Sequence, residues 1–308
     1  MTPVRKIVCL LILTIAISVV ACRNPDIPSG GETKGNINLL MGNPSQATSS
    51  PGNSENYLIV RPQYALSYSK KKGIPNWVSW ELNSSWLGDA RRVGKFAPDD
   101  ELPAGWERVK PSDYTGSGFD RGHMTNSEDR SRSPADNIPT FLMTNIIPQS
   151  PDNNQGPWVQ LENYSRELVR SGKELYIISG GYGQGGIGKN GLKATVGQGK
   201  VLVPAVTWKV ILVLDKPNAG VAGVNKNTRT IAVIMPNKQG IKYEPWQQYR
   251  TSVQAVEKLT GYNFFTSVPP DIRQVIALKV DAIEYRSRVP TRGTPTQLTC
   301  RGAPCGYP

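Results

Sequence analysis

Histidine is almost absent from this sequence. The 308 residues contain one, His123. This excludes zinc sites that need two or more imidazoles, such as an H-E-x-x-H motif or a three-histidine cage. If an imidazole performs acid–base chemistry here near neutral pH, it is His123. A lone histidine is more often structural than catalytic, so its surroundings must decide between the two roles.

Cysteine is scarce and lies only near the two ends of the chain. Cys9 and Cys22 are close to the N-terminus, and Cys300 and Cys305 are close to the C-terminus. In an oxidising compartment the last two could close a small loop, and the sequence leaves open whether they do. A metal site on this pair is disfavoured, because no other soft ligand is available.

Long apolar runs are also missing, apart from residues 7–20 behind Arg5 and Lys6. This layout is typical of a secretory signal peptide and is too short for a comfortable membrane span. The run ends in Val-Val-Ala-Cys22, which resembles a bacterial lipobox, in which the cysteine becomes a lipid-bearing N-terminus. The alternative is an ordinary signal peptide with a chance cysteine. We therefore expect an exported protein, either a membrane-anchored lipoprotein or a periplasmic or extracellular one.

Composition divides the remaining chain into three parts. Residues 22–55 are rich in Ser, Gly, Asn and Pro and predict a flexible linker, within which residues 36–41 could form a short docking strand. Residues 56–285 form one domain with a substantial core. Residues 286–308 form a tail with many Pro and Gly residues. A hydrophobic content of 38% and a mean hydropathy of −0.38 are typical of a soluble globular chain.

Acidic residues are outnumbered, and the formal net charge is +12. An excess of this size favours polyanionic partners such as nucleic acid, or an anionic membrane surface. Charge alone is weak evidence, because many secreted basic proteins bind no particular polyanion.

Hydrophobic periodicity predicts a mixture of strands and helices without regular βαβ alternation, which indicates an α+β fold. The expected strands are residues 57–68, 77–82, 141–147, 174–179, 206–214 and 230–235, the first two forming a hairpin. The expected helices are residues 158–169, 246–259 and 270–278.

A glycine-rich stretch, residues 180–199, has a sequence close to that of a phosphate-binding loop. Asn190 stands where that loop needs Ser or Thr to hold Mg²⁺, and the residues that follow do not open a helix. We therefore expect a strand-to-strand connection.

Two motifs are better candidates for chemistry. In Asp120-Arg121-Gly122-His123, the histidine adjoins an arginine that could bind phosphate. It also precedes a polar segment, residues 125–136, in which a core histidine would be out of place.

The second motif combines an amide-rich segment, residues 145–158, with a helix. Amide oxygens are hard neutral ligands that suit Mg²⁺ or Mn²⁺. Asn154, Trp158, Glu162 and Arg166 recur at spacings of four, which keeps them on neighbouring faces of the helix. The alternative is a surface ion pair, Glu162 with Arg166, on a helix whose Trp158 and Leu161 face the core.

Together these motifs resemble a known family. Asp120-Arg-Gly-His123, Thr144-Asn-Ile-Ile-Pro-Gln149 and Asn154-x-x-x-Trp158-x-x-Leu-Glu162 are similar to the DNA/RNA non-specific endonucleases of the ββα-metal class, in particular the cyanobacterial-type nuclease A group. The similarity runs from about residue 55 to about residue 285. It implies a central, mostly antiparallel sheet flanked by helices, with a ββα-metal motif at the active site.

The resemblance also implies roles for individual residues. His123 corresponds to the general base, and Asn154 to the single protein ligand of Mg²⁺, which Mn²⁺ could replace. Glu162 corresponds to the carboxylate that holds the water molecules of the metal. Further matches are the arginines around the scissile phosphate and an acid that shapes the site: Arg92 (with Arg91 as the alternative register), Arg121, Arg166 and Asp120.

The implied activity is hydrolysis of phosphodiester bonds in single- and double-stranded DNA and RNA, leaving 5′-phosphates. With a free imidazole as base, activity should fall below about pH 6.5. The alternative is an envelope lipoprotein that captures nucleic acid without cleaving it. The resemblance makes a dedicated protein inhibitor conceivable, and the oligomeric state is left open.

Overall fold

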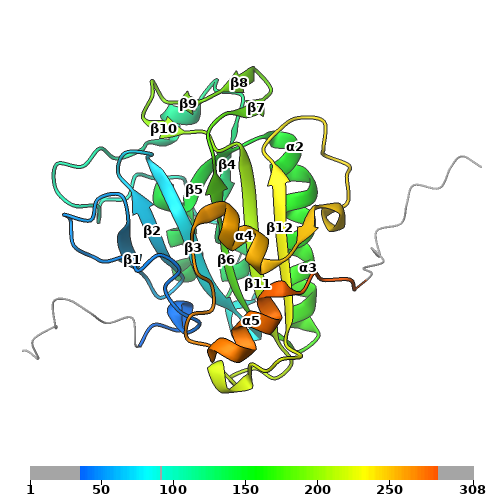
Figure 1. The fold of residues 1–308 in the computed structure, drawn as a ribbon. Coiled ribbons are helices and arrows are strands. Elements are labelled where there is room, and N and C mark those ends of the chain that lie inside the picture. Colours follow the sequence, from blue (N-terminus) through cyan, green and yellow to red (C-terminus); the bar gives the residue numbers. More distant parts are fainter. Residues whose placement is uncertain (1–34, 91, 284–308) are drawn as a thin grey trace, which may run out of the picture.

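A seven-stranded antiparallel sheet forms the centre of the protein (Figure 1). The computed structural model describes residues 35–90 and 92–283. The sheet has the order β1-β2-β3-β6-β11-β12-β13, and all its neighbouring strands are antiparallel. Its strands are β1 (Tyr57–Val60), β2 (Ala65–Ser69), β3 (Ile74–Leu82), β6 (Glu174–Tyr182), β11 (Val206–Leu214), β12 (Arg229–Pro236) and β13 (Arg250–Thr251). The predicted α+β class with a mostly antiparallel central sheet is confirmed.

Helices cover both faces of this sheet. In Figure 1, α4 (Val253–Thr260) and α5 (Pro270–Leu278) lie in front of it, and α3 (Val159–Arg170) lies behind. Side chains of a strand alternate between its two faces. Accordingly, Trp208, Val210 and Leu212 of β11 join the core beneath α4, whereas Ile211 and Val213 join the core beneath α3.

Shorter elements lie outside the central sheet. The two short helices are α1 (Pro134–Asn137) and α2 (Pro151–Asn153), and the three small two-stranded sheets pair β4 (Asp120–His123) with β5 (Ile146–Gln149), β7 (Gly186–Gly188) with β8 (Gly191–Lys193), and β9 (Thr195–Val196) with β10 (Val201–Leu202). Within the glycine-rich stretch, hairpins follow β6 and no helix does. This agrees with the strand-to-strand connection that the sequence predicted.

The β4–β5 pair explains the glycine of the Asp-Arg-Gly-His motif. Gly122 lies opposite Ile147 in the ladder, and a Cβ built on it would come within 2.6 Å of the Cβ of Gln149. Real Cβ atoms do not approach so closely, so a side chain here would push the two strands apart. The close pairing therefore requires glycine beside His123.

Three predicted elements have the wrong extent. The strand predicted over residues 57–68 is two strands, because the chain turns between Arg61 and Tyr64, whose backbone groups are hydrogen-bonded at 2.9 Å. The segment 141–147 is mainly a series of 3-10 turns, and only its end enters β5.

The helix predicted over residues 246–259 is also interrupted. A 3-10 turn (Trp246–Tyr249) is followed by β13, which pairs with β12 at the edge of the sheet. The side chain of Ser252 then caps α4 by accepting a hydrogen bond from the Ala255 N–H. The pairing of β13 with β12 and the cap at Ser252 therefore interrupt the helix that the apolar periodicity predicts.

The predicted flexible linker is wrong for its second half. Residues 36–41 dock beside β3 as the prediction allowed, but as a 3-10 turn (Ile37–Leu39) and not as a strand. Asn38 is 2% exposed, and its amide donates to the Arg61 carbonyl and accepts from the Glu81 N–H. Leu39 and Met41 join the core beneath α4. The polar composition suggested a solvated linker, but the asparagines of this segment form hydrogen bonds to protein groups.

The expected signal peptide, the lipid-attachment residue Cys22 and the cysteine-containing tail lie outside the described residues. Within residues 35–90 and 92–283, no helix combines the length and the apolar character that crossing a membrane would require.

Candidate active site

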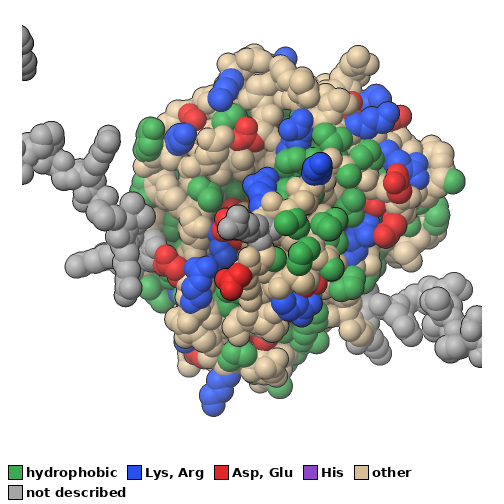
Figure 2. Space-filling view, turned by 180° about the vertical axis from the view of Figure 1, so that it is seen from behind, with side chains coloured by type: hydrophobic (Ala, Val, Ile, Leu, Met, Phe, Trp, Pro, Cys, Tyr) green, Lys and Arg blue, Asp and Glu red, His purple; other side chains and the backbone are tan. Residues whose placement is uncertain are grey.

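The predicted site residues come together around one cleft on the α3 side of the sheet. The cleft has a volume of about 300 Å³. It lies between β4, the 3-10 turn that follows β4, and the start of α3. Figure 2 shows this side of the molecule, where Lys and Arg side chains gather with Asp and Glu side chains among them. The residues that line the cleft are Arg92, Arg121, His123, Asn126, Ser127, Glu128, Asn154, Gln155, Val159, Glu162 and Arg166.

His123, at the end of β4, is 8% exposed and packed between aromatic rings. Its ring lies 4.9 Å from Phe141 in an edge-to-face arrangement and 5.2 Å from Phe96. Nε2 is buried and has no hydrogen-bond partner among the described residues. The histidine is therefore buried, although the sequence suggested that burial was out of place there. The polar segment that follows also contains buried, hydrogen-bonded side chains, among them Asp129 and Arg130.

This environment keeps the imidazole neutral. Burial, with a smaller contribution from the positive charge of Arg92, lowers the pKa of His123 to about 3. The neutral imidazole is the form that can accept a proton, as a general base does, and the same burial makes it a weaker base than free imidazole. The loss of activity near pH 6.5 that the sequence suggested is therefore not expected from this residue.

Asn154 begins a widened helical turn (Asn154–Trp158) between α2 and α3. Its Nδ2 donates to Asp120 Oδ2 at 2.9 Å, and Gln155 Nε2 donates to the same oxygen at 2.9 Å. Asp120 does not line the cleft, but it fixes how the Asn154 amide is turned. The amide oxygen is left without a hydrogen bond to the described residues.

The other amides of this segment serve the scaffold. Asn145 accepts from the Thr125 N–H and donates to the Thr125 and Thr140 carbonyls. Asn153 donates to Thr207 and to the Pro236 carbonyl. The amides of this segment therefore have two roles. Those of Asn145 and Asn153 hold the scaffold together, whereas those of Asn154 and Gln155 line the cleft.

These residues fit a hard divalent cation. Asn154, whose amide oxygen accepts no hydrogen bond from the described residues, lines a cleft that Glu162 also lines. Amide and carboxylate oxygens are both ligands that Mg²⁺ and Mn²⁺ accept. Among the described residues, no group of three or more His, Cys, Asp or Glu side chains could form a conventional metal cage. A metal in this cleft would therefore have few protein ligands, and water would complete its coordination.

Glu162, on α3, is 4% exposed, so the surface ion pair that the sequence left open is excluded. Its Oε2 accepts from Asn126 Nδ2 at 2.6 Å, and its Oε1 lies 3.9 Å from Lys209 Nζ. Burial raises the pKa of Glu162 to about 7, although Lys209 and Arg166 oppose that rise. The carboxylate is therefore close to its titration midpoint near neutral pH.

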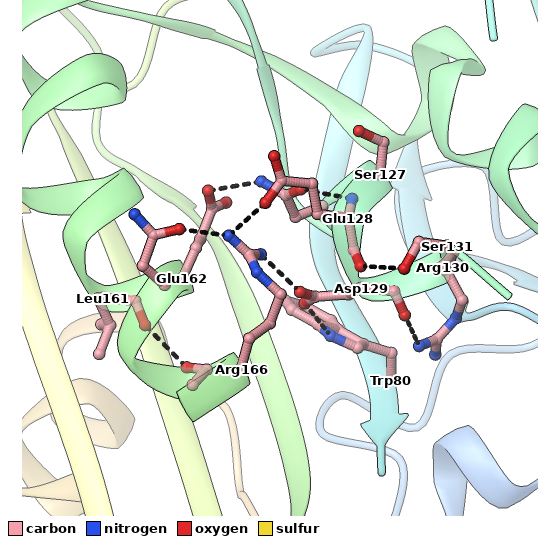
Figure 3. A network of polar contacts seen from close by, with 12 residues as sticks. Trp80, Ser127, Glu128, Asp129, Arg130, Ser131, Leu161, Glu162 and Arg166 are labelled. Atoms are coloured by element: carbon pink, nitrogen blue, oxygen red, sulfur yellow. Dashed lines mark hydrogen bonds and ion pairs between the residues drawn. The ribbon is translucent and has the colours of Figure 1, made fainter. Parts of the chain in front are cut away.

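Arg166, one turn further along α3, is 2% exposed and is held by three acceptors (Figure 3). It forms ion pairs of 2.8 Å with Asp129 and with Glu128, and it donates to Asn163 at 2.6 Å. Its guanidinium still lines the cleft. In this arrangement Arg166 supplies a fixed positive charge beside Glu162.

Two more arginines form the opposite wall. Arg121 donates twice to the Pro111 carbonyl and lies 5.4 Å from the Phe96 ring. Arg92 is exposed and lies 5.0 Å from the Phe141 ring. Arg92 therefore reaches the cleft, whereas Arg91, the alternative register, lies outside the described residues.

Sequence reasoning missed four residues that hold this site together. Asn126, Glu128 and Asp129 lie in the polar segment after His123, where only their density of polar groups was noticed. Lys209 was included in a buried strand without comment. A lysine between Trp208 and the apolar run Val-Ile-Leu-Val-Leu of β11 is the signal that could have found it, because a buried lysine needs a partner.

Comparison with known proteins agrees with this geometry. The sequence matches the DNA/RNA non-specific endonuclease family over residues 41–271. It is 51% identical over 245 residues to a nuclease of Nostoc sp., covering 80% of this chain and 86% of that protein. It is 32% identical to human mitochondrial nuclease EXOG over 70% of this chain, but it spans only 59% of EXOG.

A solved structure shares the fold. It is described as the EndoG/EndoGI complex, showing the mechanism of EndoG inhibition. The TM-score is 0.62 at 22% identity, over 75% of this chain and 91% of that one. The family match begins at residue 41, inside the segment predicted as linker, in agreement with the docked turn. This chain belongs to the family of DNA/RNA non-specific endonucleases, which are metal-dependent nucleases.

Proposed function

We propose that the protein is an exported, Mg²⁺-dependent endonuclease that hydrolyses DNA and RNA with His123 as the general base. The observation that carries this proposal is the cleft itself. It brings a buried neutral imidazole, an amide oxygen without a hydrogen-bond partner and a carboxylate to one space lined by arginines.

His123 accepts the proton from the attacking water. The hydroxide so formed attacks phosphorus and the P–O3′ bond breaks. The departing 3′ oxygen takes a proton from a water molecule in the cleft, so the products carry a 5′-phosphate and a 3′-hydroxyl, and His123 later releases its proton to solvent. Burial against Phe96 and Phe141 keeps the imidazole in the form that can accept a proton.

Asn154 would hold Mg²⁺ through its amide oxygen, with Asp120 fixing the orientation of the amide. When bound, the ion neutralises charge on the phosphoryl group and on the leaving oxygen. Glu162 would accept hydrogen bonds from the water molecules around the ion, and Asn126 fixes the second oxygen of that carboxylate. Mn²⁺ prefers the same donors and should replace Mg²⁺.

The arginines stabilise negative charge on the scissile phosphate. Arg92 has the most exposed guanidinium of the three, whereas Arg121 and Arg166 are already bound to backbone or carboxylate oxygens. None of these groups reads a base edge, so we expect cleavage of single- and double-stranded DNA and RNA with little sequence preference. Contacts to the phosphate backbone should make binding sensitive to salt.

The N-terminal sequence supports a proposal for localisation, and a related solved structure supports one for a partner. We propose export through residues 1–21 and attachment to a membrane through a lipid on Cys22. The related EndoG structure contains an inhibitor named EndoGI, and this supports testing for a protein inhibitor of the present chain.

The test is degradation of plasmid DNA and of RNA by the exported chain, in Mg²⁺, in Mn²⁺ and in EDTA. Native protein should cleave both polymers only with metal, and His123→Ala should lose about 100-fold to 10,000-fold in rate while still binding oligonucleotide. Binding without cleavage in any metal would instead indicate a nucleic-acid-capturing envelope lipoprotein.

A further inference from the structure

Lys209 lies in an unusual position on the central strand β11. Its neighbours on the same face of the strand, Ile211 and Val213, are core residues, and Lys209 itself is 1% exposed. A buried ammonium is costly unless it is paired. An apolar side chain would pack equally well on this face of the strand. Packing therefore does not explain why the residue is charged.

The surroundings of Lys209 hold its ammonium at one point. Nζ lies 4.1 Å from the centre of the Trp158 ring and 5.7 Å from that of Trp80. Indole faces attract cations, and these two rings come from different elements, the turn before α3 and strand β3. The ammonium is therefore held 3.9 Å from Oε1 of Glu162, a residue that lines the cleft.

Lys209 belongs to a cluster of four buried charges. The other members are Glu162 and Arg166 on α3 and Asp129 on the turn after β4. Arg166 already has Asp129 as its direct partner at 2.8 Å. Lys209 is then the cation left to balance Glu162, and burial lowers its own pKa while Glu162 and Asp129 raise it.

We infer that Lys209 is a positioning residue of the nuclease reaction, which acts through Glu162 by keeping that carboxylate charged and directed into the cleft. It does not touch substrate. The inference rests on the proposed role of Glu162 in holding the water molecules of the metal.

The test is a double-mutant cycle on the full chain, built from Lys209→Met, Glu162→Gln and the double variant. Three quantities are measured for each: the rate of DNA cleavage at saturating Mg²⁺, the affinity for Mg²⁺ by calorimetry, and Tm. Glu162→Gln alone reports on the proposed function, and the cycle reports on Lys209.

Lys209→Met should lower the cleavage rate and the Mg²⁺ affinity by roughly 10-fold to 100-fold. Removing the ammonium leaves the buried Glu162 carboxylate without its cation, so Tm should fall, and the double variant should recover part of that loss. In the Glu162→Gln background the same substitution should change neither rate nor affinity further. Equal losses in both backgrounds, or an unchanged Mg²⁺ affinity in Lys209→Met, would overturn the inference.

Two additional variants control for misfolding and for the general effect of removing a lysine. Lys209→Gln removes the charge but keeps a polar side chain, and it should reproduce the loss of Mg²⁺ affinity if Lys209→Met does not fold. Lys173→Met is the matched control, because Lys173 forms a 2.8 Å ion pair with the exposed Asp215 away from the cleft. It should leave the rate and the Mg²⁺ affinity unchanged.

Discussion

The cleft and the scaffold around it are built from the same residue types, used in opposite ways. Asn153 and Asn154 are adjacent, yet Asn153 donates to Thr207 and to the Pro236 carbonyl, while the amide oxygen of Asn154 accepts no hydrogen bond from the described residues. Arg130 is fully buried and donates to three backbone carbonyls, whereas Arg92 is exposed at the rim of the cleft.

The acids show the same contrast. Burial raises the pKa of both Glu81 and Glu162 to about 7. Glu81 accepts from the Trp86 indole and is not part of the cleft, while Glu162 lines the cleft between two cations. A shifted pKa therefore does not identify the site by itself. The site is identified by several chemically active side chains that line the same cleft.

The largest contrast is expected between the two adjacent asparagines. Asn154→Ala should lower the cleavage rate on the order of 100-fold or more, because it removes the proposed metal ligand, with little change in stability. Asn153→Ala should cost about 2–3 kcal/mol of unfolding free energy, since it leaves buried partners unsatisfied. Rates at saturating Mg²⁺ and urea unfolding curves check both. If both variants lost activity and stability to the same extent, the two asparagines would not have the separate roles proposed here.

A smaller effect is expected at Asp120, which orients the Asn154 amide from outside the cleft. Asp120→Ala should reduce Mg²⁺ affinity and rate by roughly 10-fold to 100-fold, as for other groups that orient a metal ligand. Excess Mg²⁺ should recover part of the rate, which a titration of rate against Mg²⁺ would show. A loss that Mg²⁺ cannot relieve would mean that Asp120 contacts substrate.

The smallest effect expected is on pH dependence. The pKa of Glu162 is raised from 4.5 to about 7, so the folded protein without metal binds this proton more tightly than the unfolded chain. Its contribution to stability is complete below pH 4.5 and is lost as the pH rises through 7. Bound metal favours the ionised form, so the gain in Tm from Mg²⁺ should be larger at pH 8 than at pH 6.

The same titration sets the acid limit of activity. Its midpoint should lie near pH 7 at low Mg²⁺ and move to lower pH as Mg²⁺ increases. His123, with its pKa near 3, should add no step between pH 5 and 8. A midpoint at pH 6.5 that does not move with Mg²⁺ would instead assign the step to an ordinary imidazole.

Much of this molecule could be predicted from its sequence. Apolar periodicity located β11 and α5 with their observed bounds, and the spacing of Asn154, Glu162 and Arg166 placed them together. The motifs identified the family. What the sequence could not show is where a polar side chain points. Asn38 was interpreted as part of a linker, although it is hydrogen-bonded to buried backbone. Lys209 was interpreted only as part of a strand, although it lies 3.9 Å from Glu162 of the cleft.

The element boundaries failed for a related reason. Arg250 and Thr251 leave an apolar helical pattern because the edge of the sheet offers them backbone partners on β12. Local propensity contains no information about that edge. Long-range hydrogen bonds, not the periodicity of the segment, decide where α4 begins.

The most direct test compares Glu162→Gln with Glu81→Gln. The measured quantities are the rate of plasmid cleavage at saturating Mg²⁺ and the Tm of each variant without metal. If the cleft carries the chemistry, Glu162→Gln loses on the order of 100-fold in rate while Tm shows that it is still folded, and Glu81→Gln keeps its rate. Full activity in Glu162→Gln, or equal losses of rate in the two variants, would contradict the account.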